Sequence, residues 1–412
     1  MKKVLLIAYH FPPLGGGGVF RTLKFTKYLP EFGYQPHVLT VKNPMYRTRD
    51  PTLVREIPSD AKVYRTFSFE HRILRAPRLL DINLKWFYMP DQNIGWLPFA
   101  VSAGAKIVKK EKIDVIYATA PLWTSLLIGF FLKRQTRKPL VIDFRDPWTD
   151  NPFITYPTKF HKWFEKKIEK IMVAHADYVT VAFDSIKNTL VKKYPFIKSK
   201  IETITNGFDP EDFKNLKIYG KTGKFTITHV GSIYGLLTAE PLLVALKELV
   251  EEKKEIREKV EAVFVGRYGK ETPLLVRKLG LQENVRFVDY VPHRQGLEFM
   301  VNSQALLLLL TVEDPRGKGI LPGKIFEYIA SRKPIIAIAP ENGRAAKIIK
   351  SVNAGTVISQ KNVQRIKEAI VDYYKQWTEG ESSTTTYNTG DITVYDRKIL
   401  TRRLAKIFEK VT

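Results

Sequence analysis

The chain alternates short apolar runs with longer segments whose apolar residues recur at helical spacing. Residues 3–9 are almost entirely apolar, which is typical of a strand buried on both faces, and residues 19–29 follow as a predicted helix. The pattern then repeats, with predicted strands at residues 38–41, 114–118, 139–144, 178–182 and 201–205. Because strands that alternate with helices build a parallel sheet, this part of the chain predicts a Rossmann-like domain.

A second series of the same kind starts at residue 225. Its longest predicted helices cover residues 239–251 and 363–377, and its strands are predicted at 225–230, 262–266, 285–290, 305–310, 335–339 and 355–359. A polar, glycine-containing stretch at 219–224 separates the two series and reads as a linker. We therefore predict an α/β protein with an N-terminal domain of residues 1–218, a C-terminal domain of residues 219–393 and a closing segment of residues 394–412.

Both series place glycines directly after their first strand. The first strand is followed by Gly15, Gly16, Gly17 and Gly18, and the strand at 225–230 is followed by Gly231 and Ser232. Glycines at such a turn let the backbone approach a phosphate or a sugar, and the next helix adds positive potential from its N-terminus. Four consecutive glycines also suit a flexible loop, so this pattern leaves both interpretations open.

Charged residues follow the predicted strand at 139–144 in the sequence DFRDPW. Asp143, Arg145 and Asp146 stand at its carboxyl end, which is where parallel sheets bind ligands. Three charges at this position indicate either chemistry or an ion-pair network that braces the loop.

The stretch 321–336 combines a predicted short helix with a buried strand. Pro322 and Gly323 suit the start of the helix, and Lys324 and Glu327 lie three residues apart on one side of it. A helix N-terminus with an adjacent lysine attracts anions, and a glutamate one turn later can accept hydrogen bonds from sugar hydroxyls. The stretch therefore suits a phosphate and a ribose together, while a solvated Lys–Glu pair on an ordinary helix is the alternative.

The net charge of the chain indicates what kind of partner it binds. Of 412 residues, 67 are Lys or Arg and 42 are Asp or Glu, for a net charge of +25. Residues 1–200 hold 34 basic and 16 acidic residues, or +18, and residues 201–412 hold 33 and 26, or +7. A basic N-terminal half indicates an anionic partner. Since the sequence has no zinc-finger spacing and no RNP motif, we expect no nucleic acid and favour a membrane surface.

Two other bulk features exclude classes of site. The chain contains no cysteine, which excludes disulfides, thiolate metal sites and cysteine nucleophiles and fits a reducing cytoplasm. No uninterrupted apolar stretch approaches the roughly 20 residues that span a bilayer. We therefore expect a cytoplasmic protein that binds the inner face of the membrane only peripherally.

Residues 158–174 suit such an association. Lysines cover much of this predicted helix, and its apolar residues are predicted to share one face: Phe160, Trp163, Phe164, Ile168, Ile171 and Met172. The pattern fits a helix in a membrane interface, and equally an ordinary surface helix packed on a core. Residues 71–80, HRILRAPRLL, also mix basic and apolar side chains, and they suit either a flap on lipid or a solvated loop.

Four segments in order carry a family resemblance. The stretch 9–40, which includes YHFPPLGGGGVFRTLKF, resembles the start of retaining GT-B glycosyltransferases of family 4, and so do DFRDPW, NGFDPEDF at 206–213 and LPGKIFEYIASRKPI at 321–335. The resemblance covers most of the chain. It implies a GT-B fold, in which two Rossmann-like domains face each other across a cleft and the final helix returns to the N-terminal domain.

The resemblance also implies a function. Such enzymes move a sugar from a nucleotide-diphosphate sugar to an acceptor, here a lipid-linked or cell-surface glycan in polysaccharide biosynthesis of the cell envelope, without a metal or another cofactor. Their DFRDPW-like segment lines the acceptor side, so we predict that Asp146 or Asp143, with Arg145 beside them, orients or deprotonates the acceptor hydroxyl. The family often has a histidine near this point, and DFRDPW contains none.

On the donor side, Glu327 matches the second Glu of the family's E-x7-E pattern, which holds the ribose. Gly319 stands where the first Glu is usual, and Glu313 and Asp314 are the nearest acids. The family's Arg and Lys after the strand at 225–230 are also missing, so Arg267 is a candidate substitute. The predicted donor-binding residues are Glu327, Lys324, Gly323, Tyr328, Gly231, Ser232 and Arg267.

Two alternatives share this fold. A nucleotide-sugar 2-epimerase has the same architecture, and the missing first Glu is consistent with a non-catalytic GT-B scaffold. Release of free nucleotide only in the presence of acceptor distinguishes the transferase from the epimerase.

Overall fold

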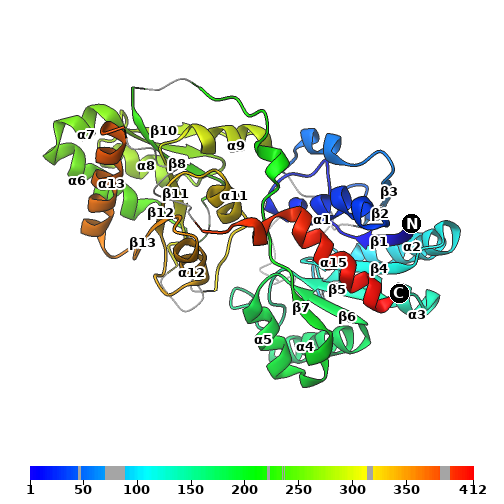
Figure 1. Ribbon diagram of the computed structural model, residues 1–412. Helices are drawn as coiled ribbons and strands as arrows, with labels where there is room; N and C mark the ends of the chain where they lie inside the picture. The colour runs from blue at the N-terminus through cyan, green and yellow to red at the C-terminus, as the bar shows by residue number, and fades with distance from the viewer. Residues whose placement is uncertain are drawn as a thin grey trace. The chain divides into compact units, whose positions relative to one another are not determined.

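The computed structural model describes residues 1–44, 48–69, 89–219, 223–233, 235, 237–312, 319–380 and 390–412. Within them the chain forms two compact units, each built around its own parallel sheet (Figure 1). The N-terminal unit contains Met1–Asn206 and Arg397–Thr412, and the C-terminal unit contains Gly207–Asp396. The predicted flap at 71–80 and the acids Glu313 and Asp314 lie outside the described residues.

Seven parallel strands form the N-terminal sheet, in the order β3-β2-β1-β4-β5-β6-β7. They are β1 (Lys2–Ile7), β2 (Tyr34–Val41), β3 (Lys62–Thr66), β4 (Val115–Ala120), β5 (Leu140–Phe144), β6 (Tyr178–Val181) and β7 (Ile201–Thr203). The helices of this unit are α1 (Gly17–Tyr28), α2 (Leu97–Glu111), α3 (Thr124–Thr136), α4 (Lys159–His175), α5 (Asp184–Lys193) and α15 (Arg397–Val411). Every side chain of β4 and β5 is buried, which explains their apolar sequences.

The last helix of the chain completes the core of the first unit. Leu404 and Phe408 of α15 are fully buried against Val4 and Leu6 of β1. Figure 1 shows α15, in red, beside α1, in blue, and the two helices are in contact. Residues at the two ends of the sequence therefore stabilise one and the same domain.

The C-terminal sheet has six parallel strands in the order β10-β9-β8-β11-β12-β13. They are β8 (Phe225–Val230), β9 (Val260–Val265), β10 (Val285–Val288), β11 (Ala305–Leu309), β12 (Ile335–Ile338) and β13 (Gly355–Ile358). The helices are α6 (Glu240–Glu252), α7 (Lys254–Lys259), α8 (Glu271–Lys278), α9 (His293–Asn302), α11 (Lys324–Ala330), α12 (Arg344–Ser351) and α13 (Val363–Thr378). Both sheets confirm the predicted class of two Rossmann-like α/β domains.

Strand β11 shows how this sheet supports a core on each face. Leu307 and Leu309 pack with α6 and α13, whereas Leu306 and Leu308 pack with α9, α11 and α12. Successive side chains of a strand point to opposite faces, so the four consecutive leucines of β11 serve both cores. This packing fixes α11, and with it Lys324 and Glu327, at the edge where β8 and β11 end.

The boundary between the units lies after Asn206 and not after Ile218 as the sequence predicted. Phe208, Phe213 and Leu216 pack into the core of the C-terminal unit, and the Phe208 amide donates to the Tyr395 carbonyl at 3.0 Å. Polar composition alone places the linker too far along the chain, because the segment before it carries three side chains that belong to the second core.

Helix α4 is oriented differently from its predicted apolar face. Its inward side carries buried polar residues, including Glu165 and Glu169, beside Met172. Its aromatic residues point outward, with Phe160 59% exposed and Trp163 53% exposed. The assignment of Met172 to the same face as these aromatics was therefore wrong. No described helix is both long and apolar enough to cross a membrane.

Candidate functional site

Two glycines shape the carboxyl ends of β8 and β9 in the C-terminal unit. Gly231 follows β8 with a φ of +131°, and a Cβ atom at this position would collide with the Lys324 side chain. Gly266 follows β9 with a φ of +134°, and its Cβ would lie 2.6 Å from the Gly231 carbonyl oxygen. Only glycine fits these two positions, because both have a positive φ and a Cβ atom at either would clash. The backbone at Gly231 can therefore lie directly against the Lys324 side chain.

Lys324 places a partly buried cation over this glycine turn. Its Nζ lies 3.2 Å from His229 Nε2, and His229 donates from Nδ1 to the Leu307 carbonyl oxygen at 2.9 Å. Burial, and then the charge of Lys324, lower the pKa of His229 far below its ordinary value. His229 is therefore neutral, and its Nε2 accepts a hydrogen bond from the lysine.

The same environment weakens the charge of the lysine itself. Burial lowers the pKa of Lys324 to about 8, and the charge of Glu327 opposes the shift only in part. Across the described ranges, no carboxylate forms an ion pair with Lys324. An ammonium group that forms no ion pair at the edge of a sheet can receive an anion from outside the protein.

Glu327 is held by a second histidine. His293, the first residue of α9, has its Nε2 atom 2.9 Å from Glu327 Oε1. Both side chains are largely buried, with 11% of His293 and 19% of Glu327 exposed. One carboxylate oxygen is thus fixed in place, and among the described residues the other oxygen makes no hydrogen bond. It can accept from a ligand hydroxyl.

Tyr328 has a bracing role instead of the predicted contact with the donor. It is fully buried, its hydroxyl accepts from the Val230 amide at 2.8 Å and it lies 3.3 Å from the Leu307 carbonyl oxygen. The hydroxyl thereby ties α11 to the ends of β8 and β11. Tyr328 therefore positions Lys324, because it fixes the helix on which both residues lie.

The other predicted donor residues lie on the open side of this edge. Gly323 is exposed and precedes α11, and Ser232 is half-buried after Gly231. Arg267 is exposed, its guanidinium lies 5.8 Å from the ring centre of Tyr290, and its carbonyl accepts from the Ile233 amide at 2.8 Å. The loops after β8 and β9 are therefore adjacent, as the prediction for Arg267 requires.

In the N-terminal unit, Asp143 is part of a buried ion-pair network. Its two oxygens accept from Arg21 at 2.7 and 2.9 Å, and from Thr119 and Thr180, each at 2.7 Å. Burial acts to raise the pKa of Asp143, but Arg21 outweighs it and holds that pKa below its ordinary value. Because all four contacts are internal and the residue is 0% exposed, Asp143 braces the sheet and does not reach an acceptor, in contrast to its predicted catalytic role.

Arg145 fastens the glycine loop. It donates to the Gly18 carbonyl at 2.5 Å, the Pro121 carbonyl at 2.6 Å and the Ala120 carbonyl at 3.1 Å. These three bonds tie Gly18, the last residue of the glycine loop, to the end of β4. Arg145 therefore positions the loop, and of the three charges in DFRDPW only Asp146 is exposed.

His10 joins this site, although the sequence interpretation did not include it. A Cβ atom on Gly18 would lie 3.4 Å from the ring of His10, so the imidazole stands against the glycine loop. Burial and the neighbouring Arg145 lower the pKa of His10 to about 4. At neutral pH it is an uncharged imidazole that can exchange a proton with a hydroxyl.

None of the three histidines of these sites could be recognised from a sequence motif. His10 follows a strand, His229 lies in one and His293 follows a proline, and none forms a spaced motif with its partner. The signal that could have indicated them is positional: a histidine at the carboxyl end of a buried parallel strand is near the ligand edge of the sheet.

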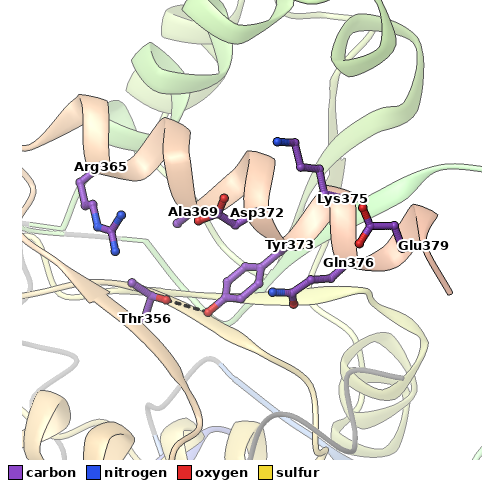
Figure 2. Close-up of a pocket in the computed structure, with 8 residues that line it drawn as sticks. All are labelled: Thr356, Arg365, Ala369, Asp372, Tyr373, Lys375, Gln376 and Glu379. Carbon is purple, nitrogen blue, oxygen red and sulfur yellow. Dashed lines mark hydrogen bonds between the residues drawn. The ribbon is translucent and has the colours of Figure 1, made fainter. Parts of the chain in front are cut away.

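A surface hollow elsewhere in the C-terminal unit has a different character. Figure 2 shows it along α13, where the Tyr373 hydroxyl and Thr356 Oγ1 are 2.8 Å apart. Its charged side chains are of both signs, namely Arg365, Lys375, Asp372 and Glu379. It includes none of the predicted donor residues, so it is not assigned to the site.

Comparison with known proteins bears on both units. The family model described as Glycosyltransferase Family 4 matches residues 15–212, and the one described as Glycosyl transferases group 1 matches residues 211–388. An uncharacterized glycosyltransferase of Methanocaldococcus jannaschii is 24% identical over 388 residues, which are 90% of this chain and 89% of that protein.

Solved structures agree on the fold. A glycosyltransferase from Rickettsia africae has a TM-score of 0.69 at 16% identity, with 100% of this chain and 98% of that chain covered. A mutant of Staphylococcus aureus TarM, in complex with fondaparinux, α-GlcNAc-glycerol and UDP, has a TM-score of 0.64 at 10% identity, with 99% and 100% covered. These likenesses confirm the GT-B fold class, and at such identities they show the fold alone.

Proposed function

The chain belongs to the family 4 glycosyltransferases of the group 1 type, and from this premise we propose that it transfers a sugar from a nucleotide-diphosphate sugar to a glycan or lipid-linked acceptor. The donor binds at the carboxyl ends of β8 and β9 in the C-terminal unit. The observation that carries this proposal is Lys324, a partly buried cation without an acidic partner in the described chain, set over a turn that only glycine fits.

The diphosphate of the donor is the anion that Lys324 receives. Neutral His229 holds the ammonium from one side, so its remaining hydrogens are free to bind phosphate oxygens. A preorganised cation stabilises the negative charge that develops on the leaving diphosphate, and it acts strongly where water is excluded. The UDP bound to TarM, a neighbour in fold, supports a nucleoside diphosphate as the ligand.

Glu327 binds the ribose of the donor. Its carboxylate accepts hydrogen bonds from vicinal hydroxyls, and His293 fixes the orientation of the carboxylate. A glutamate that one side chain already holds loses little conformational entropy when the sugar binds. His293 is therefore a positioning residue in the donor site.

On the acceptor side, His10 and Asp146 replace the predicted pair of aspartates. His10 is neutral and stands against the glycine loop, and Asp146 is the exposed carboxylate of DFRDPW. These two groups orient the acceptor hydroxyl and take its proton as the new glycosidic bond forms. Retention of configuration and independence from metal ions are part of the proposal, and they follow from the family.

A transfer assay with Lys324→Met tests this function. With the correct donor and acceptor, the wild-type enzyme releases nucleoside diphosphate, and the variant releases it at least ten times more slowly because the leaving group loses its cation. Lys347→Met, which removes an exposed lysine from α12 of the same unit, is the matched control and keeps the rate. Equal rates for all three proteins would contradict the proposal.

The same assay separates the predicted alternatives. An epimerase changes the sugar of the donor without any acceptor, whereas a transferase releases nucleotide only when acceptor is present. The family models and the relative describe glycosyltransferases, so neither the epimerase nor the scaffold is favoured.

We also propose that the enzyme works at an anionic membrane surface, as suits a lipid-linked acceptor of the cell envelope. The outer face of α4 carries Phe160, Trp163, Phe164 and Ile171, which are 36–59% exposed. Exposed lysines flank them at positions 159, 162, 166, 167 and 170. Aromatic residues between lysines suit the boundary of headgroups and acyl chains, where rings enter the lipid and ammonium groups meet phosphates.

The inner face of α4 explains why its aromatic residues point outward. Trp148 donates to Glu165 at 2.8 Å, while Glu169 accepts from Thr149 Oγ1 at 3.0 Å and pairs with Lys193 at 2.5 Å. These buried bonds require the carboxylates to face the protein. The aromatic residues therefore lie on the outer face of α4. Their exposure to water is energetically unfavourable, and contact with a membrane removes this cost.

A further inference from the structure

A pocket in the N-terminal unit lies at the carboxyl ends of β1, β2 and β3. Its floor is made of apolar and aromatic residues, among which Tyr9, Phe11 and Leu14 are at most 3% exposed. Its charged lining consists of Lys42, Arg49 and Arg65. Among the described residues that line this pocket, none is acidic. It is distinct from the donor site, which the C-terminal unit provides.

The three cations of the pocket are not neutralised within the described residues. None of them forms an ion pair with a carboxylate there, and Arg65 bonds only to the Pro12 carbonyl oxygen, at 2.5 Å. The three side chains are exposed, whereas the buried cations Arg21 and Lys24 are paired with Asp143 at 2.7 Å and with Glu56 at 2.5 Å. Three positive charges that line one pocket, and that pair with no acid among the described residues, suit an anionic ligand.

Two segments that contribute to the pocket, residues 13–15 and 48–50, are joined through their backbones. The Gly15 amide donates to the Thr48 carbonyl at 3.0 Å, and the Asp50 amide donates to the Pro13 carbonyl at 2.9 Å. Leu14 and Arg49 form an isolated antiparallel bridge between the same two segments. A preformed pocket binds its ligand with little loss of conformational entropy.

The pocket is also continuous with the acceptor side of the site. Tyr9 precedes His10 in the chain, and Leu14 immediately precedes the glycine loop. Arg145 and His10 hold the far end of that loop, at Gly18. A ligand anchored in the pocket therefore lies along the segment that carries the residues proposed to act on the acceptor.

We propose that this pocket binds an anionic group of the acceptor, a phosphate or a carboxylate attached to a sugar. The inference rests on the proposed glycosyltransferase function and specifies its acceptor class. Arg49 and Arg65 bind the anion through paired N–H donors, whose fork geometry fits both groups. Lys42 adds charge, and the apolar floor accommodates the face of the sugar ring. Neutral sugars are poor acceptors in this account.

Binding of three small sugars tests the proposal without knowledge of the natural acceptor. Glucose 6-phosphate, glucuronate and glucose are titrated into the full chain by calorimetry at one ionic strength. We expect the anionic sugars to bind at least ten times more tightly than glucose, and Arg49→Gln and Arg65→Gln each to weaken them about ten-fold. Tighter binding of glucose 6-phosphate identifies a phosphate ligand, and tighter binding of glucuronate identifies a carboxylate.

Lys62→Gln is the matched control, because this exposed lysine of β3 pairs with Glu111 at 2.6 Å and does not line the pocket. Equal binding of all three sugars, or unchanged binding by both arginine variants, would overturn the proposal. Nucleoside diphosphate binding by the same samples reports on the C-terminal unit and on folding. If it persists while anionic sugars fail to bind, only the acceptor pocket is wrong.

Discussion

Lys324 shows how the surroundings of one residue set its chemistry. Burial lowers its pKa to about 8, so at neutral pH it remains charged but is poorly compensated by the protein. A bound diphosphate supplies the missing negative charge and raises this pKa. The lysine thus gains its partner only when the donor is present, which couples nucleotide binding to protonation.

This coupling gives a measurable proton uptake. Near pH 8.5 the free enzyme holds Lys324 partly deprotonated, while the complex with a nucleoside diphosphate holds it protonated, so binding takes up a proton and affinity falls as the pH rises above 8. The ligand phosphates are already ionised at this pH and contribute little. Calorimetry in two buffers of different ionisation enthalpy detects the uptake. A binding enthalpy that is the same in both buffers would contradict it, and Lys324→Met should abolish the difference.

Replacement by asparagine is expected to lower the stability of the protein at Asp143 and the rate of transfer at Asp146. Asp143→Asn leaves the Arg21 guanidinium buried without its counter-charge, and we expect a loss of about 3–5 kcal/mol in the free energy of unfolding. Asp146→Asn changes an exposed side chain, so stability should stay within about 0.5 kcal/mol while transfer slows. Urea unfolding and transfer rates measured on both variants check this. A stable but inactive Asp143→Asn would restore the catalytic role first predicted for it.

His10 makes the free energy of unfolding depend on pH in the acidic range. Its pKa is about 4 in the folded protein and near the ordinary 6.5 when unfolded, so between these values the unfolded chain binds more protons. Stability is therefore lost as the pH falls from 6.5 towards 4. We expect His10→Gln to reduce the loss of unfolding free energy between pH 7 and pH 4.5, as urea titrations can measure. An unchanged loss would place the acid sensitivity elsewhere.

At the scale of elements, the periodic pattern identified α4 but could not orient it. Its aromatic residues and its glutamates both recur at helical spacing, so the sequence offers two possible inner faces. The choice is made by Trp148, Thr149 and Lys193, which are distant in sequence or outside the helix and bond to the glutamates. Long-range polar partners of this kind cannot be derived from periodicity.

The outward aromatic stripe predicts binding to lipid. We expect the protein to float with vesicles that contain phosphatidylglycerol or phosphatidylserine and not with purely zwitterionic vesicles. Phe160→Ser combined with Phe164→Ser should reduce the bound fraction several-fold, since both rings are lost from the stripe. Leu274→Ser, which removes a 61% exposed side chain from the C-terminal unit, is the matched control. Equal flotation with both kinds of vesicle would contradict the proposal.

At the scale of the whole molecule, the sequence predicted two Rossmann-like domains correctly because strand and helix patterns are local. It predicted that Lys324 and Glu327 lie on one short helix, which is confirmed, while their binding of a donor stays a prediction. It missed His229 and His293, whose partners lie 95 and 34 residues away in the chain. It also missed that Tyr328 and Asp143 are turned inward, since burial is decided by the packed fold.

Metal independence is a prediction about the complete reaction. Lys324 supplies the charge that a divalent cation would otherwise supply to the leaving diphosphate. We therefore expect transfer rates to be unchanged, within about two-fold, after dialysis against EDTA. A rate that falls at least ten-fold and recovers with Mg²⁺ or Mn²⁺ would contradict this expectation and require a metal in the donor complex.

Lys324 and Glu327 are proposed to bind a nucleoside diphosphate in the C-terminal unit. The most direct test of this proposal is the shift in Tm caused by a panel of nucleoside diphosphates and nucleotide sugars, measured on wild type, Glu327→Ala and the exposed control Glu283→Ala. A ligand that binds only the folded protein raises Tm. We predict a rise selective for one base in wild type and in Glu283→Ala, and its loss in Glu327→Ala. If no nucleotide raises Tm, or if Glu327→Ala responds as wild type does, the proposal is contradicted.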